Sequence, residues 1–143
     1  MAAARRLVDP LTVTIDTVAV LVVDDQESFR EALTAMIGVA DGFRLAGAVA
    51  SGDEAVAHVG ARAVDLVLLD VNLGEDSGLE VCRVLLAEAR APKVVLMSAY
   101  RREELPADLD SLGVPFVAKD QLSPATLTQW WRELGGRERT EPG

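Results

Sequence analysis

The sequence has one cysteine, Cys82, and one histidine, His58. One cysteine excludes an intramolecular disulfide and a multi-cysteine metal site, and one histidine excludes a metal site built from several histidines. The longest apolar run, at 18–23, has six residues, whereas a membrane-spanning helix needs about 18. The first ten residues include two arginines but no continuous apolar segment, so we expect no secretory signal peptide there. We therefore expect a cytoplasmic protein with no membrane partner.

Positive charge is also scarce. Lysine and arginine total 14 against 23 acidic residues, which gives a net charge of −9. Such a chain repels nucleic acid, so we expect no direct nucleic-acid binding by these residues. Half of the residues are hydrophobic and the length is 143 residues, which excludes a disordered acidic tail and fits one domain.

Short runs rich in valine and leucine, without polar alternation, recur along the chain. Such runs are typical of strands that are buried on both faces of a parallel sheet. Two weaker segments complete a set of five expected strands. They lie at 18–23, 43–49, 65–70, 94–97 and 114–118.

Segments of helical period separate these runs, as in the repeat of apolar residues from Phe29 to Ile37. Ser51 and Ser77 are each followed three residues later by a glutamate, which predicts capping boxes at two helix starts. Ser123 and Pro124 predict a third start, with proline at the first helical position. Five strands that alternate with five helices indicate an α/β fold with a doubly wound parallel sheet.

In such a sheet the functional crevice lies at the carboxyl ends of the strands. Several polar residues follow the expected strands directly, and they would therefore share one edge. They are Asp24 and Asp25 after the first strand, Asp70 and Asn72 at the third, Ser98 after the fourth and Lys119 after the fifth. Alone, each has an ordinary explanation as a helix cap, a turn former or a solvated charge. Their shared position favours a functional site.

Three carboxylates in one crevice repel each other, so they must either take up a proton or bind a cation. Oxygen ligands favour a hard ion, magnesium or manganese, and the backbone carbonyl of Asn72 would add a neutral ligand. A metal ion beside Asp70 with Lys119 opposite forms a pocket for a phosphoryl group, to which Ser98 would donate a hydrogen bond. The carboxylate of Asp70 would be the nucleophile. No phosphate-binding glycine motif follows the first strand.

The chain resembles the receiver domain of bacterial two-component response regulators (CheY-like). The resemblance covers residues 18–134 and rests on the segments LVVDDQESFR, LVLLDVNLGEDSGLEV, LMSAY and FVAKD, in that order. It implies the flavodoxin-like strand order 2-1-3-4-5. It also divides the chain into an N-terminal extension (1–16), a receiver domain (17–134) and a flexible tail (135–143).

The resemblance implies a role for each matching residue. Asp70 matches the phosphoacceptor, which takes the phosphoryl group from a sensor histidine kinase. Asp24 and Asp25 match the acidic pair that binds Mg2+ together with Asp70 and the Asn72 carbonyl. Ser98 and Lys119 match the hydroxyl and the lysine that contact the phosphoryl group. The remaining matches are the aromatic switch residue, Phe116, and the accessory positions Ala99 and Tyr100.

Such a receiver catalyses its own phosphorylation and slow dephosphorylation, and it is a signalling module rather than a conventional enzyme. Phosphorylation would change the face formed by the fourth helix, fifth strand and fifth helix, which binds a downstream protein or a second copy.

Two residues depart from the family pattern: Gly74 and Asp120 stand where proline is common. The second leaves open whether the Lys119–Asp120 bond is cis.

Several segments, FRLAGAVASGDEA among them, are similar to receivers that precede a LuxR-type DNA-binding domain. The N-terminal half of such a transcriptional regulator is therefore an alternative to a stand-alone receiver. A phosphate-independent interaction module and a metal-dependent phosphatase are further alternatives.

Outside the expected site we predict the burial of four residues. We expect Cys82 to be a core thiol and His58 to be half-buried or exposed. We expect one of Trp130 and Trp131 to lie on the surface, since adjacent helical residues point about 100° apart.

Overall fold

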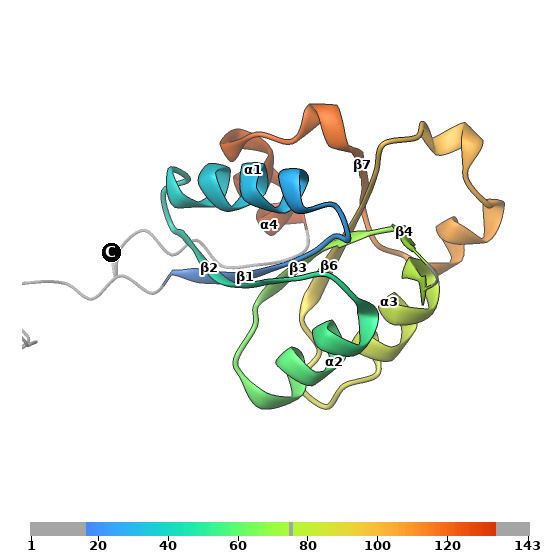
Figure 1. Ribbon diagram of the computed structural model, residues 1–143, viewed down its shortest axis with the longest axis horizontal. Helices are drawn as coiled ribbons and strands as arrows, with labels where there is room; N and C mark the ends of the chain where they lie inside the picture. Colours follow the sequence, from blue (N-terminus) through green and yellow to red (C-terminus); the bar gives the residue numbers. More distant parts are fainter. Residues whose placement is uncertain (1–16, 75, 134–143) are drawn as a thin grey trace, which may run out of the picture.

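The computed structural model describes residues 17–74 and 76–133, and its centre is a five-stranded parallel sheet (Figure 1). The strands are β1 (Val18–Val23), β2 (Phe43–Val49), β3 (Leu66–Asp70), β6 (Lys93–Ser98) and β7 (Phe116–Ala118). Their order is β2-β1-β3-β6-β7, and all four neighbouring pairs are parallel. The predicted fold class and strand order are confirmed. The predicted extension and tail lie outside the described residues.

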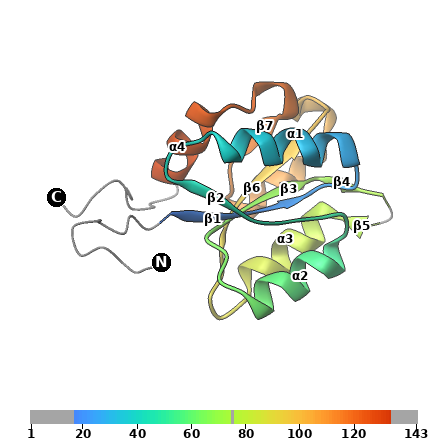
Figure 2. The ribbon, with the colours of Figure 1, turned by 60° about the vertical axis from the view of Figure 1, so that its left-hand side comes forward.

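Helices cover both faces of the sheet, as Figures 1 and 2 show. The helices α1 (Glu27–Gly38) and α4 (Pro124–Glu133) lie on one face, and α2 (Gly52–Ala61) and α3 (Gly78–Leu86) lie on the other. None of the helices described is long and apolar enough to cross a membrane.

The sheet separates two hydrophobic clusters because successive side chains of a strand point to opposite faces. Val20 and Val22 join the cluster that includes Leu33, Ile37 and Leu127, which we call the α1/α4 core. Leu21 and Val23 join the opposite cluster, which we call the α2/α3 core and which contains Ala55, Val59, Cys82 and Leu85. The apolar runs read from the sequence are therefore strands buried on both faces.

The helix starts follow the predicted caps. The hydroxyl oxygens of Ser51, Ser77 and Ser123 accept hydrogen bonds from backbone N–H groups three residues later, and α4 begins at Pro124. The capping box at Ser77 is incomplete because the carboxylate of Glu80 pairs with Arg83 instead.

The connection between β6 and β7 differs from the expected fourth helix. It contains two 3-10 segments, η1 (Arg102–Glu104) and η2 (Ala107–Leu112), and a third, η3 (Lys119–Gln121), follows β7. Pro106 explains the interruption, because the residue before a proline is disfavoured in helical conformation. Leu105 is accordingly extended, with φ −107° and ψ 161°.

The expectation for the two tryptophans was wrong, because Trp130 and Trp131 are each only 7% exposed. Both belong to the α1/α4 core, and the ammonium of Lys93 lies 5.9 Å from the centroid of the Trp131 ring. The two adjacent side chains therefore enter the same hydrophobic cluster, although neighbouring helical positions point about 100° apart. Cys82 is buried and His58 is half-buried, as predicted.

A short antiparallel hairpin follows β3. It is formed by β4 (Asn72–Leu73) and β5 (Asp76–Ser77), and it leads directly into α3. Gly74 lies in this hairpin with φ +65°, a conformation that favours glycine. Oδ2 of Asp76 accepts a hydrogen bond of 3.1 Å from the N–H of Gly52, so the hairpin also holds the start of α2.

Candidate functional site

The parallel register of the sheet brings the three predicted aspartates together. Strands β1 and β3 lie side by side with Val23 opposite Leu69, so Asp24, directly after β1, and Asp70, the last residue of β3, are neighbours. Asp25 is the next residue along the chain. One carboxylate oxygen from each of the three aspartates lies within 4.8 Å of the other two. The structure therefore builds the acidic crevice that the strand-end argument predicted.

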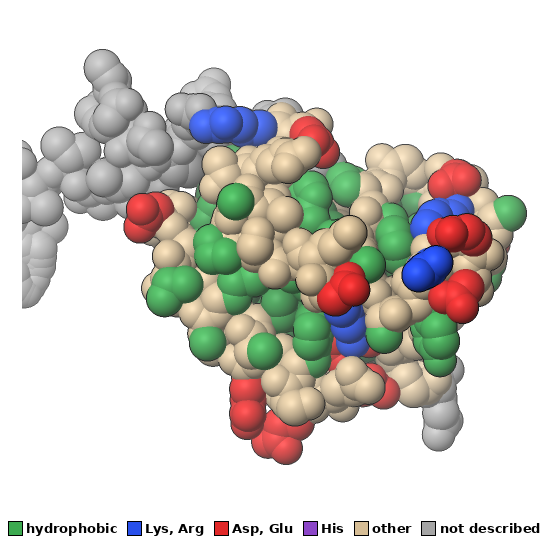
Figure 3. All heavy atoms as spheres, turned by 90° about the horizontal axis from the view of Figure 1, so that it is seen from above, with side chains coloured by type: hydrophobic (Ala, Val, Ile, Leu, Met, Phe, Trp, Pro, Cys, Tyr) green, Lys and Arg blue, Asp and Glu red, His purple; other side chains and the backbone are tan. Residues whose placement is uncertain are grey.

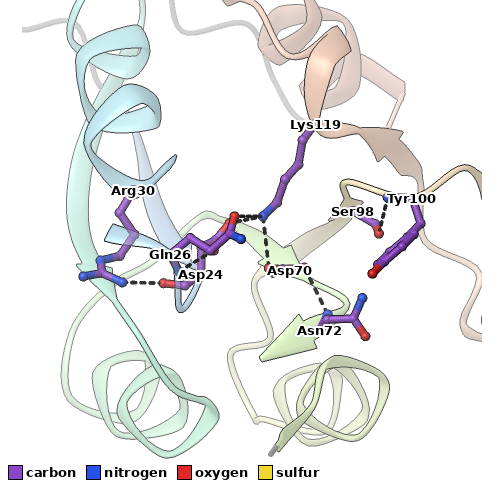
Figure 4. A network of polar contacts seen from close by, with 8 residues as sticks. All are labelled: Asp24, Gln26, Arg30, Asp70, Asn72, Ser98, Tyr100 and Lys119. Carbon is purple, nitrogen blue, oxygen red and sulfur yellow. Dashed lines mark hydrogen bonds and ion pairs between the residues drawn. The ribbon is translucent and has the colours of Figure 1, made fainter. Parts of the chain in front are cut away.

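Asp24 is fully buried and is held from two directions. Its Oδ1 accepts a hydrogen bond of 2.8 Å from the N–H of Gln26, and its backbone carbonyl accepts one of 2.7 Å from the guanidinium of Arg30 (Figure 4). Asp25 is exposed to solvent. The acidic pair thus offers one fixed, buried carboxylate and one that is open to water.

Asp70 is 4% exposed at the end of β3. Its Oδ1 accepts a hydrogen bond of 3.0 Å from the N–H of Asn72, and its Oδ2 accepts one of 3.1 Å from the ammonium of Lys119. Burial raises the pKa of Asp70 to about 6, although the Asn72 N–H and the Lys119 charge act in the opposite direction.

Lys119 joins the two buried carboxylates. Its Nζ lies 2.6 Å from Oδ2 of Asp24 and 3.1 Å from Oδ2 of Asp70, and its side chain is 9% exposed. One ammonium against three carboxylates leaves the crevice with excess negative charge when all are ionised. Such a crevice attracts a further cation.

The carboxylate oxygens of the crevice are suitable ligands for a hard divalent cation. Oδ2 of Asp24 is buried and takes part in no hydrogen bond among the described residues; its one close partner is the Lys119 ammonium. All the ligand atoms in the acidic triad are carboxylate oxygens, which is the chemistry that Mg2+ prefers. Asn72 contributes its N–H to Asp70, and the predicted use of its carbonyl as a ligand stays a prediction.

The other predicted residues line the edge beyond Asp70. Ser98 is fully buried at the end of β6, and its Oγ accepts a hydrogen bond of 3.0 Å from the N–H of Tyr100 (Figure 4). Tyr100 is 55% exposed, and Ala99 is also exposed. Phe116 is half-buried on β7, opposite Leu96 of β6.

No peptide bond in the described segments is cis, so Lys119 and Asp120 are joined by a trans bond. The alternative that the sequence left open is thereby settled for this structure. The fold places Lys119 without the energetic cost of a cis bond between two non-proline residues.

Gly78 allows the strand that ends at Asp70 to approach α3. A Cβ atom at this position would lie 2.4 Å from the backbone oxygen of Asp70 and 2.6 Å from that of Val71. Such distances are too short for any side chain. The N–H of Gly78 donates a 2.9 Å hydrogen bond to the Val71 oxygen, so this contact fixes the backbone around Asp70.

Three residues of the site were not found from the sequence. Gln26 and Arg30 contact Asp24, Oε1 of Gln26 lies 3.4 Å from the Lys119 ammonium, and the centroid of the Phe29 ring lies 4.4 Å from it. Phe29 was interpreted only as part of an apolar helical repeat. Gln26 and Arg30 follow the acidic pair closely in the sequence, and that proximity was the available signal.

Charged side chains are distributed in small groups over the face shown in Figure 3. Lysine and arginine side chains there lie beside acidic ones. The overall charge of −9 and this interspersed pattern do not resemble a continuous basic surface for nucleic acid.

Comparison with known proteins agrees with this geometry. The family described as "Response regulator receiver domain" matches residues 20–129. A DNA-binding response regulator MtrA from Mycolicibacterium smegmatis is 34% identical over 123 residues, which is 86% of this chain and 53% of MtrA. The DNA-binding transcriptional activator DevR/DosR from Mycobacterium tuberculosis is 33% identical over 104 residues, or 72% of this chain and 48% of that protein.

Among solved structures, a two-component response regulator of the LuxR family from Aurantimonas sp. superposes with a TM-score of 0.72 at 23% identity. The match covers 88% of this chain and 91% of that one, and it supports the fold. The chain spans between 30% and 55% of the length of the first curated relatives that it matches.

Proposed function

Because the chain belongs to the response regulator receiver family, we propose that it receives a phosphoryl group on Asp70 from the phosphohistidine of a sensor histidine kinase. The observation that carries this proposal is the acidic triad of Asp24, Asp25 and Asp70, with the Lys119 ammonium bridging two of its members. This arrangement supplies a nucleophile and opposite charge in one crevice at the edge of the sheet.

In the proposed transfer, a carboxylate oxygen of Asp70 attacks phosphorus, and the bond between phosphorus and the kinase imidazole nitrogen breaks. The electron pair of that bond stays on the imidazole. The product is an acyl phosphate on Asp70, which water later cleaves to inorganic phosphate and the free carboxylate. The reaction requires the ionised form of Asp70, and its pKa of about 6 leaves this form predominant at neutral pH.

Residues of this chain would hold the metal and the phosphoryl group. Carboxylates of Asp24, Asp25 and Asp70 and the carbonyl of Asn72 would bind Mg2+, which neutralises phosphoryl oxygens and draws them to the nucleophile when bound. The Lys119 ammonium, already 3.1 Å from Asp70 Oδ2, would contact a second phosphoryl oxygen, and the Ser98 hydroxyl a third.

The response would pass from Ser98 to Phe116 and to the face formed by η1, η2, β7 and α4. Ser98 is buried and its Oγ accepts a hydrogen bond from the Tyr100 N–H, so the side chain would turn toward Asp70 to donate its hydroxyl proton to a phosphoryl oxygen. Phe116 lies on the neighbouring strand and is half-buried, so its ring is partly open to solvent and would turn inward as Ser98 moves. The partner on this face would be a downstream protein or a second copy of the chain, in the cytoplasm.

The relatives suggest that the receiver is combined with different outputs. One is a protein-glutamate methylesterase and another a DNA-binding activator, and the chain covers 30% and 48% of these proteins. The second candidate function is therefore the receiver part of a LuxR-type transcriptional regulator. The reading frame beyond Gly143 discriminates between the two, since such a regulator continues into a helix-turn-helix domain.

The phosphoacceptor is tested by incubating the chain with acetyl phosphate and Mg2+ and measuring its intact mass. We expect one added phosphoryl group in the wild type and none in Asp70→Asn. Asp41→Asn, an exposed aspartate in the turn before β2, is the matched control and should be phosphorylated normally. Absence of any addition at saturating donor would favour a phosphate-independent interaction module. Rapid turnover of small phosphate esters would favour a phosphatase.

A further inference from the structure

Four groups surround the ammonium of Lys119. Three are oxygens: Oδ2 of Asp24 at 2.6 Å, Oδ2 of Asp70 at 3.1 Å and Oε1 of Gln26 at 3.4 Å. The fourth is the aromatic ring of Phe29, whose centroid lies 4.4 Å from Nζ. The π face of an aromatic ring carries negative potential and attracts a cation within about 6 Å.

The Phe29 ring is anchored independently of the acidic crevice. It projects from the first turn of α1, is half-buried, and packs against the α1/α4 core. The Gln26 side chain, by contrast, is exposed. Phe29 therefore offers Lys119 a contact whose position is set by hydrophobic packing.

The Phe29 ring differs from the Asp24 and Asp70 carboxylates because it takes no part in the proposed phosphorylation. Asp70 is the residue that reacts, and Asp24, whose Oδ2 faces Lys119, belongs to the proposed metal-binding triad. Both carboxylates would then be shared with other groups. The ring binds no metal and accepts no phosphoryl group, so it is available to the ammonium before and during the transfer.

We infer that Phe29 is a positioning residue for Lys119: its ring confines the ammonium beside Asp70, so that an incoming phosphoryl group meets a cation already in place. Preorganised charge accelerates a reaction because no rearrangement is needed as the transition state forms. This inference rests on the proposed phosphotransfer function. The competing explanation is that Phe29 only fills the α1/α4 core while the carboxylates alone place Lys119.

Graded fluorination of Phe29 separates these explanations. Fluorine substituents withdraw electrons from the π face but change the size and hydrophobicity of the ring little. Mono-, di- and trifluorophenylalanine would be introduced at position 29 by nonsense suppression. The matched control is the same series at Phe43, which packs against the same core but is not the aromatic ring that faces the Lys119 ammonium.

The first readout is the rate constant of phosphorylation by acetyl phosphate with Mg2+. A cation–π contact of ordinary strength predicts a fall of about two- to tenfold across the Phe29 series, graded with the number of fluorines. In the Phe43 series the rate constant should not change. A rate constant that also stays unchanged across the Phe29 series would overturn the inference, as would an equal decline in both series.

The second readout needs no phosphorylation. The sequence has two lysines, Lys93 and Lys119, so the side-chain NMR signals of Lys119 can be assigned with a Lys93→Arg variant. We expect the methylene protons next to Nζ to show a ring-current shift that is lost in Phe29→Leu and retained in Phe29→Tyr. Unchanged shifts in Phe29→Leu would contradict the contact. A wild type that shows the shift but accepts no phosphoryl group would refute the proposed function and leave the contact standing.

Discussion

The ammonium of Lys119 and Oδ2 of Asp24 are 2.6 Å apart, and neither side chain is more than 9% exposed. This ion pair supplies positive charge to the crevice in the metal-free protein. Asp24 also belongs to the acidic triad whose oxygens fit Mg2+. Lys119 and a bound metal ion would therefore compete for part of the same negative charge.

Replacement of Lys119 with methionine should have opposite effects on stability and metal binding. Without Mg2+, we expect the free energy of unfolding to fall by about 2–4 kcal/mol, because two buried carboxylates lose their counter-charge. The Mg2+ affinity should rise about tenfold, because a competing cation is gone. Urea unfolding in EDTA and calorimetric titration with Mg2+ measure these quantities. Lys93→Met is the control, and an unchanged Mg2+ affinity in Lys119→Met would contradict the competition.

The stability of the metal-free protein should depend on the protonation of Asp70. Its pKa is raised from 3.8 to about 6, so the folded state keeps a proton that the unfolded chain has lost between about pH 4 and 6. The contribution of this carboxyl to stability therefore falls as pH rises through that interval. We expect Asp70→Asn to be more stable than the wild type by about 1–2 kcal/mol at pH 7.5, after allowance for solvent screening.

Urea titrations in EDTA test this dependence. The advantage of Asp70→Asn should shrink between pH 7.5 and pH 4.5, and excess Mg2+ at pH 7.5 should favour the wild type. A stability difference that is independent of pH would show that Asp70 is already ionised without cost in the folded state.

Gly78 should be intolerant of the smallest side chain. The methyl group of Gly78→Ala would meet the backbone oxygens of Asp70 and Val71, so we expect a loss of about 2–4 kcal/mol in unfolding free energy and slower phosphorylation. Gly60→Ala is the matched control, because a Cβ there has no atom within 4 Å. It lies in α2 and should stabilise the fold by about 0.5–1 kcal/mol. Equal effects of the two substitutions would contradict the close approach.

The Cys82 thiol should be unreactive in the native protein. It is fully buried in the α2/α3 core, and burial raises its pKa to about 11, so little thiolate exists at pH 8. We expect a thiol reagent such as dithionitrobenzoate to react at the rate of opening of the fold, and at full speed in urea. Fast labelling without denaturant would show that the α2/α3 core opens readily.

Much of the fold could be predicted because three of its strands contain continuous apolar runs with no polar alternation. The runs 18–23, 66–69 and 94–97 within β1, β3 and β6 are apolar, as burial on both faces requires, and the polar residues that follow each run lie where the parallel topology puts them. The acidic crevice followed from that rule alone. Hydrophobic patterning predicts less where contacts between distant segments determine the local structure.

Two features show where this reasoning failed. Pro106 was visible in the sequence, but its consequence, two 3-10 segments in place of one helix, depends on how the chain crosses from β6 to β7. The contact of Phe29 with Lys119 joins residues 90 positions apart in the chain (119 − 29). Helical periodicity assigned Phe29 to the core, and a half-buried ring can serve both the core and a neighbouring charge.

The division of the interior by the sheet has a practical consequence for folding studies. Both tryptophans report on the layer beneath α1 and α4, whereas the lone thiol reports on the opposite layer. Tryptophan emission and thiol labelling thus monitor the two halves of the molecule separately without any engineered label. Coincident transitions would establish that the halves unfold as one cooperative unit, and separated transitions would reveal which of them opens first.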